Sequence, residues 1–155
     1  MTGLRYLIVD DSPTVRLTIR QALVHEKVPA ELIAEAGSAQ AAVEAFDRAP
    51  ADVVFLDVNL QSGPPPAPAG GQILPILTPP PARPDGGNDV ARNLTAKNPR
   101  LMVIVCTGNP PDDPRVRELI QNGAFQLLQK PVRMAQIRDV LRQVREERAG
   151  AGSDD

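Results

Sequence analysis

A short apolar run in the middle of the chain decides which folds are open to it. Val53-Val54-Phe55-Leu56 stops abruptly at Asp57, within a segment that reaches from Asp52 to Leu60. An unbroken run of this length, rich in β-branched residues, indicates a strand buried on both faces, as in a parallel sheet. Ligands of such sheets bind at the carboxyl ends of the strands, so Asp57 is a candidate site residue. Taken alone, an Asp in this position is more often a turn former or a helix cap.

Four further strands are expected to alternate with helices along the chain. The strands are expected at residues 6–9, 31–35, 101–106 and 125–129. Serines 12 and 38 and Asn88 or Asp89 are candidate helix caps. The expected helices carry apolar side chains at helical spacing: Val15, Ile19, Ala22 and Leu23; Ala42, Val43 and Phe46; Val90 and Leu94; Val116, Leu119 and Ile120; Met134, Ile137, Val140, Leu141 and Val144. Strict alternation of this kind predicts an α/β fold, with a parallel sheet covered by helices on both faces.

Size and charge narrow the class of protein. A chain of 155 residues predicts a single domain, here 1–148, followed by a disordered polar tail, 149–155. Its formal net charge of −2 offers no long-range attraction for nucleic acid or an anionic membrane. The apolar runs are too short for a spanning segment and nothing resembles a signal peptide, so a cytoplasmic location is expected. Cys106, the single cysteine, is interpreted as a buried small hydrophobe.

A Pro/Gly-rich insertion, residues 61–87, interrupts the alternation after the third strand. Its composition favours extended or disordered chain, and Ile73-Leu74-Pro75-Ile76-Leu77 forms an apolar patch within it. A surface insertion without a specific role is one interpretation. The other is a polyproline-type element that docks a partner.

Charged and hydroxyl side chains follow the expected strands where each strand ends. Asp10 and Asp11 follow the first strand, Asp57 the third, Thr107 the fourth and Lys130 the fifth. The carboxyl ends of parallel strands share one edge of the sheet, so these residues can converge. Three carboxylates favour a hard divalent cation such as Mg²⁺. A carboxylate nucleophile, Mg²⁺, a lysine and a hydroxyl are together suited to accepting a phosphoryl group.

These segments give the chain a family resemblance. It resembles the receiver domain of two-component response regulators over nearly its whole length, apart from the insertion and the tail. The resemblance rests on these segments: Leu7-Ile8-Val9-Asp10-Asp11-Ser12, Val53-Val54-Phe55-Leu56-Asp57, Val103-Ile104-Val105-Cys106-Thr107-Gly108, Gly123-Ala124 and Lys130-Pro131. It implies a flavodoxin-like (βα)5 three-layer sandwich with strand order 2-1-3-4-5.

The resemblance also implies a site and partners. Asp57 would be the phospho-acceptor, and Thr107 and Lys130 would contact the phosphoryl group. Mg²⁺ would be bound by Asp11, Asp57 and the backbone carbonyl of Asn59, with Asp10 acting through water. The Lys130-Pro131 peptide would be cis. The protein would be a stand-alone phospho-acceptor rather than an enzyme acting on other molecules. It would receive phosphate from a sensor histidine kinase or a histidine phosphotransfer protein and signal to an unidentified downstream protein, as a monomer or weak homodimer.

Two other readings remain open at this stage. A receiver-like binding module without phosphorylation could engage a partner through the Pro-rich insertion; Leu127, which stands where receivers usually have an aromatic residue, is consistent with it. A haloacid-type phosphatase would need a second carboxylate where this chain has Asn59. Arg16 and Arg20, on the first helix, are most simply interpreted as part of a solvated face.

Overall fold

The described part of the chain folds as five strands and five α-helices in alternation. The computed structural model describes residues 4–58, 60, 86–110 and 112–152. Its strands are β1 (Tyr6–Val9), β2 (Ile33–Ala36), β3 (Val53–Asp57), β4 (Met102–Thr107) and β5 (Gln126–Gln129). Its helices are α1 (Pro13–His25), α2 (Ala39–Arg48), α3 (Gly86–Lys97), α4 (Pro114–Gln121) and α5 (Met134–Gly152). All pairings are parallel and the strand order is β2-β1-β3-β4-β5, so the predicted flavodoxin-like topology is confirmed.

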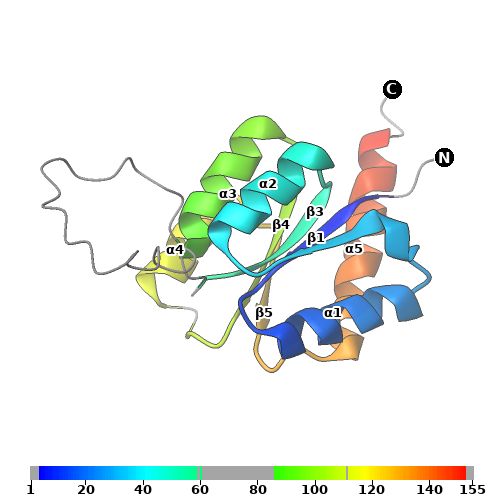
Figure 1. Ribbon diagram of the computed structural model, residues 1–155, viewed down its shortest axis with the longest axis horizontal. Coiled ribbons are helices and arrows are strands. Elements are labelled where there is room, and N and C mark those ends of the chain that lie inside the picture. The colour runs from blue at the N-terminus through cyan, green and yellow to red at the C-terminus, as the bar shows by residue number, and fades with distance from the viewer. Residues whose placement is uncertain (1–3, 59, 61–85, 111, 153–155) are drawn as a thin grey trace, which may run out of the picture.

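The sheet forms the middle of three layers, with α2, α3 and α4 on one face and α1 and α5 on the other (Figure 1). Successive side chains of a strand point to opposite faces, and the two cores divide in that way. Val54 and Leu56 pack with α2, α3 and α4, whereas Val53 and Phe55 pack with α1 and α5. Every residue of β3 is buried, as the unbroken apolar run predicted.

Serine and aspartate caps fix where several helices begin. The Ser12 hydroxyl accepts a hydrogen bond from Val15 N, with Pro13 as the first helical residue of α1. The Ser38 hydroxyl accepts from Ala41 N at the start of α2, and Asp113 accepts from Arg115 N at the start of α4. These residues satisfy backbone donors that have no partner within the helix. The turn between β1 and α1 is thereby kept to three residues.

Some predicted boundaries were wrong. The second strand was expected at 31–35, but Ala30–Leu32 form a 3-10 turn and the strand begins at Ile33, because Leu32 N donates to Pro29 O. The predicted disordered tail began at residue 149, yet α5 continues to Gly152. Alanine is the strongest helix former, and Ala149 and Ala151 are compatible with that extension. Ile120 was expected to lie with Val116 and Leu119 on the apolar side of its helix, but in α4 it is 45% exposed.

The start of α3 also differs from the prediction. Asn88 or Asp89 was expected to cap this helix, which begins instead at Gly86. Gly87 N donates a hydrogen bond to Val58 O at 3.3 Å, which joins the first turn of α3 to the residue after β3. The predicted insertion of 61–87 therefore overlaps the helix by two residues. The rest of it, including the apolar patch at 73–77, lies outside the described residues. In the part of the chain that is described, no helix is long and apolar enough to cross a membrane.

Arg148 of α5 contacts the chain just before β3 and just before β4, at the edge of the sheet opposite to Asp57. Its Nη2 donates to the backbone oxygens of Arg100 (3.1 Å) and Asp52 (3.4 Å) and lies 3.7 Å from Asp52 Oδ1. Its side chain is only 22% exposed. We expect Arg148→Ala to lower the free energy of unfolding in urea by about 1–2 kcal/mol, because carbonyl acceptors lose a charged donor.

The matched control for that variant is Arg142→Ala. Arg142 lies on the same helix, is 64% exposed and pairs only with Asp139 among the contacts of the described residues. Exposed pairs of this kind contribute little, so its change should stay below about 0.5 kcal/mol. Equal losses for the two variants would show that the Arg148 contacts add nothing beyond helix propensity.

Candidate functional site

The candidate site lies at the edge of the sheet where the parallel strands end. Asp10 follows β1, Asp57 is the last residue of β3, Thr107 is the last residue of β4 and Lys130 follows β5. The parallel register aligns these ends, so residues far apart in sequence lie together. Asp10, Asp57 and Thr107 are the buried polar residues of the described chain.

Three carboxylates form the centre of the site. Ligand oxygens of Asp10, Asp11 and Asp57 lie within 4.8 Å of one another. Asp10 and Asp57 are 1% and 3% exposed, whereas Asp11 is exposed. Asp10 Oδ2 is buried, and its partner among the described residues is the ammonium of Lys130, 2.9 Å away. An all-oxygen donor set whose ligand atoms lie this close together fits a hard divalent cation such as Mg²⁺. Asn59, the fourth predicted ligand, lies outside the described residues.

Lys130 supplies positive charge to this cluster. Its Nζ lies 2.9 Å from Asp10 Oδ2 and 3.4 Å from Asp57 Oδ2. Burial by itself would lower the pKa of Lys130, but its contacts with the two carboxylates outweigh that effect and raise the pKa above its ordinary value. The raised pKa keeps the Lys130 ammonium charged at neutral pH, and this charge is lost only when the pH rises through that pKa. One ammonium faces three carboxylates, so the site still favours a further cation.

Thr107 is fixed by the loop that follows β4. Its hydroxyl oxygen accepts a hydrogen bond from Asn109 N at 2.9 Å, and its backbone oxygen accepts from Lys130 N at 2.8 Å. Gln129 Nε2 donates to Asn109 O, and Asn109 Nδ2 donates to Asp113, the cap of α4. Because the Thr107 hydroxyl accepts from a main-chain N–H, its own proton remains to be donated.

Three further predicted features lie close to the site. The Lys130-Pro131 peptide is cis, as the resemblance implied. Leu127 of β5 is half-buried and packs against the core shared with α2, α3 and α4. Cys106 is buried and pairs in register with Asp57, and burial raises the pKa of its thiol. That position agrees with the prediction of a small buried hydrophobe.

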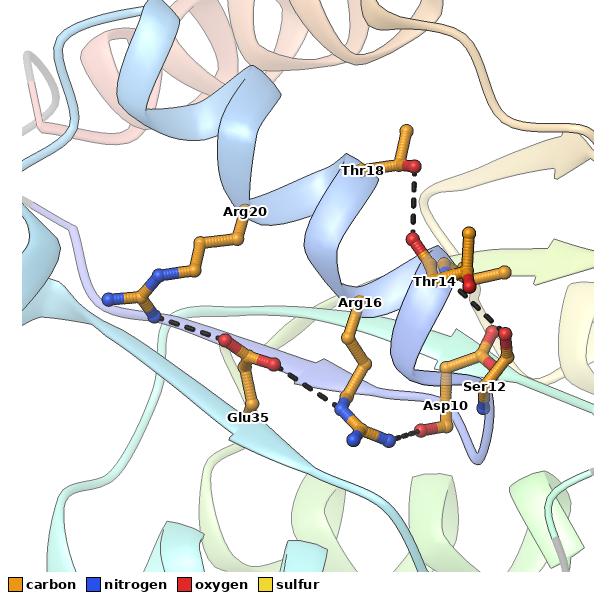
Figure 2. Close-up of polar contacts among 8 residues, drawn as sticks. Asp10, Ser12, Thr14, Arg16, Thr18, Arg20 and Glu35 are labelled. Atoms are coloured by element: carbon orange, nitrogen blue, oxygen red, sulfur yellow. Dashed lines mark hydrogen bonds and ion pairs between the residues drawn. The ribbon is translucent and has the colours of Figure 1, made fainter.

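Arg16 is the residue whose position the sequence did not predict. It was expected on a solvated face, but its side chain is only 20% exposed and its Nη1 donates to Asp10 O at 2.6 Å (Figure 2). Helical side chains lean toward the helix N-terminus, so a long cation four residues after the cap can reach the preceding turn. That direction, combined with the acidic pair just before the helix, is the signal that could have identified it.

Solved structures of other proteins share this fold. The receiver domain of AraT, a response regulator from Geobacillus stearothermophilus, matches with a TM-score of 0.74 and 23% identity, over 97% of this chain and 99% of that one. A CheY-like receiver domain protein from Methanospirillum hungatei matches with a TM-score of 0.70 and 18% identity, over 99% and 100%.

The chemotaxis protein CheY4 of Vibrio cholerae matches with a TM-score of 0.66 and 18% identity, over 92% of this chain and 99% of that one. No family model and no curated protein sequence matches the chain. The chain therefore has the fold of response-regulator receiver domains, and the predicted resemblance is confirmed at that level.

Proposed function

We propose that the chain is a phospho-acceptor: Asp57 receives a phosphoryl group from a phosphohistidine donor in a Mg²⁺-dependent reaction. The observation that carries this proposal is the cluster of Asp10, Asp11 and Asp57, with ligand oxygens within 4.8 Å of one another and Lys130 beside them. The receiver-domain fold supports a signalling role. A sensor histidine kinase or a histidine phosphotransfer protein would be the donor.

In the transfer, an Asp57 carboxylate oxygen attacks phosphorus. The new P–O bond forms as the P–N bond to the donor imidazole breaks, and the imidazole nitrogen keeps the electron pair and takes up a proton. Asp11 and Asp57 would hold Mg²⁺ directly and Asp10 would hold it through water, and the bound ion would supply positive charge to the phosphoryl oxygens. Lys130 would pair with one of these oxygens, and the Thr107 hydroxyl would donate to another.

The consequence of transfer would be a changed surface. Lys130 would exchange part of its pairing with Asp57 for the phosphoryl group, and Thr107 is linked through Asn109 to the cap of α4. A protein that contacts α4, β5 or α5 could read that change. We expect the protein to act in the cytoplasm, as a monomer or weak homodimer.

The test is intact-mass spectrometry after incubation with Mg²⁺ and a small acyl phosphate. A single phosphoryl adduct on the wild-type protein, absent from Asp57→Asn and absent when EDTA replaces Mg²⁺, is the expected result. Circular dichroism of each sample establishes that the fold is intact. A folded wild-type protein without an adduct, or an adduct that persists in Asp57→Asn, would overturn the proposal.

The alternative of a binding module without phosphorylation is not favoured. It depends on the Pro-rich insertion, of which 61–85 lie outside the described residues, and on Leu127, which is half-buried and packs against the apolar core. Two results together would support it: the protein forms no phosphoryl adduct, and deletion of 61–85 abolishes binding of a partner.

A further inference from the structure

Arg16 joins three parts of the fold beside the acidic cluster. It belongs to the second turn of α1, its Nη1 donates to the backbone oxygen of Asp10 at 2.6 Å, and its Nε pairs with Glu35 Oε1 of β2 at 3.3 Å (Figure 2). A guanidinium can make both contacts at once because its donors are fixed in one plane. Arg16 therefore links the turn after β1 to the neighbouring strand, β2.

A second arginine and a glycine favour this placement. Arg20 Nη1 pairs with the other Glu35 oxygen, Oε2, at 3.2 Å, so Glu35 is held from two sides. Directly after the carboxyl end of β2, a Cβ at Gly37 would lie 3.1 Å from Arg16 Nη1, closer than most side-chain contacts. A residue with a side chain at position 37 would therefore crowd the guanidinium.

The contact to Asp10 fixes the peptide that joins the first two carboxylates. The Asp10 carbonyl belongs to the peptide bond between Asp10 and Asp11, so its orientation affects where both side chains point. Asp10 is held at two more atoms: Oδ1 accepts from Ser12 N at 2.9 Å, and Oδ2 lies 2.9 Å from Lys130 Nζ. Asp10 N also donates to Ala36 O at 3.1 Å, so Arg16 supplies the contact to the carbonyl, one of four attachments of this residue.

We propose that Arg16 is a positioning residue, which orients the Asp10-Asp11 peptide so that both carboxylates face one divalent cation. The inference rests on the proposed function for the identity of that cation. It also makes a prediction opposite to simple electrostatics. A guanidinium near an acidic cluster repels Mg²⁺, so removing its charge alone would tighten binding. Loss of positioning would weaken binding instead.

The experiment is isothermal titration of the metal-free protein with Mg²⁺ alone. We expect Arg16→Gln to weaken Mg²⁺ affinity about tenfold, the range seen when residues behind metal ligands are removed. Arg16→Lys keeps the charge but cannot make both contacts, so it should also weaken affinity, by about threefold or more. Arg20→Gln is the matched control, because Arg20 shares Glu35 but not Asp10, and it should bind Mg²⁺ as the wild-type protein does.

Thermal unfolding without Mg²⁺ separates positioning from a general structural role. If Arg16 were only structural, its removal would lower the unfolding midpoint but leave the Mg²⁺ affinity of the folded protein unchanged. Three results would overturn the inference. They are an Mg²⁺ affinity of Arg16→Gln that is unchanged or higher, a wild-type affinity for Arg16→Lys, and an equal loss of affinity for Arg20→Gln. Its failure is distinct from that of the proposed function. A wild-type protein that binds Mg²⁺ but forms no adduct contradicts only the phosphotransfer, whereas an adduct with unchanged Mg²⁺ affinity in both Arg16 variants contradicts only the positioning role.

Discussion

Lys130→Met is expected to slow formation of the phosphoryl adduct about a hundredfold, the usual loss when one group that stabilises transition-state charge is removed. The same variant should bind Mg²⁺ more tightly, roughly threefold, because the ammonium 2.9 Å from Asp10 and 3.4 Å from Asp57 no longer competes for those carboxylates. The two measurements are a mass-spectrometric time course with a small acyl phosphate and a calorimetric titration with Mg²⁺.

Lys97→Met serves as the control for that experiment. Lys97 pairs with Asp47 on the surface between α3 and α2 and has no contact with the acidic cluster. It should leave both quantities unchanged. If Lys130→Met reacted at the wild-type rate while binding Mg²⁺ more tightly, Lys130 would balance charge in the resting protein without contacting the phosphoryl group.

Gly87→Ala is expected to lower the free energy of unfolding by about 3 kcal/mol, the upper part of the usual range for overpacking. A Cβ at this position would lie 2.4 Å from the backbone oxygen of Asp57 and 3.0 Å from Val58 Cα. Both are main-chain atoms, so the strand end or the first turn of α3 must move. Elsewhere in a helix the same change normally stabilises by about 0.5–1 kcal/mol, so the sign of the effect is diagnostic.

Urea denaturation measures this loss, and Mg²⁺ titration measures its effect on the site. Affinity should fall, since the displaced backbone carries Asp57. Gly108→Ala is the control, because a Cβ there meets nothing within 4 Å, and its change should stay within about 0.5 kcal/mol. A neutral or stabilising Gly87→Ala would mean that the start of α3 can move away from β3 without loss.

Local patterns were enough to predict the sheet and the convergence of the acidic residues. The apolar runs before Asp10, Asp57 and Thr107 indicate buried strands, and parallel strands bring their carboxyl ends to one edge. The serine caps at 12 and 38 were also visible in the sequence, because a cap acts on the residues immediately after it.

Features that depend on neighbours from elsewhere in the chain were not predicted. Asn88 is a good cap by propensity, but its Nδ2 instead donates to Glu118 and the Arg115 carbonyl of α4. The helix begins instead at Gly86, and Gly87 in its first turn donates to Val58 O and lies against the Asp57 backbone. Arg16 looked solvated because nothing local shows that Glu35 of β2 lies within its reach.

The contact between Val58 and Gly87 closes a loop in the chain, and closing a loop costs conformational entropy. Gly87 N lies 3.3 Å from Val58 O, so the fold brings together the two described residues on either side of positions 59–86. The entropy of closing a flexible loop grows only with the logarithm of its length, and a fivefold shorter connection would lower the free-energy cost by about 1.4 kcal/mol. On chain entropy alone, this segment could be shortened or lengthened by selection with little effect on whether the domain folds.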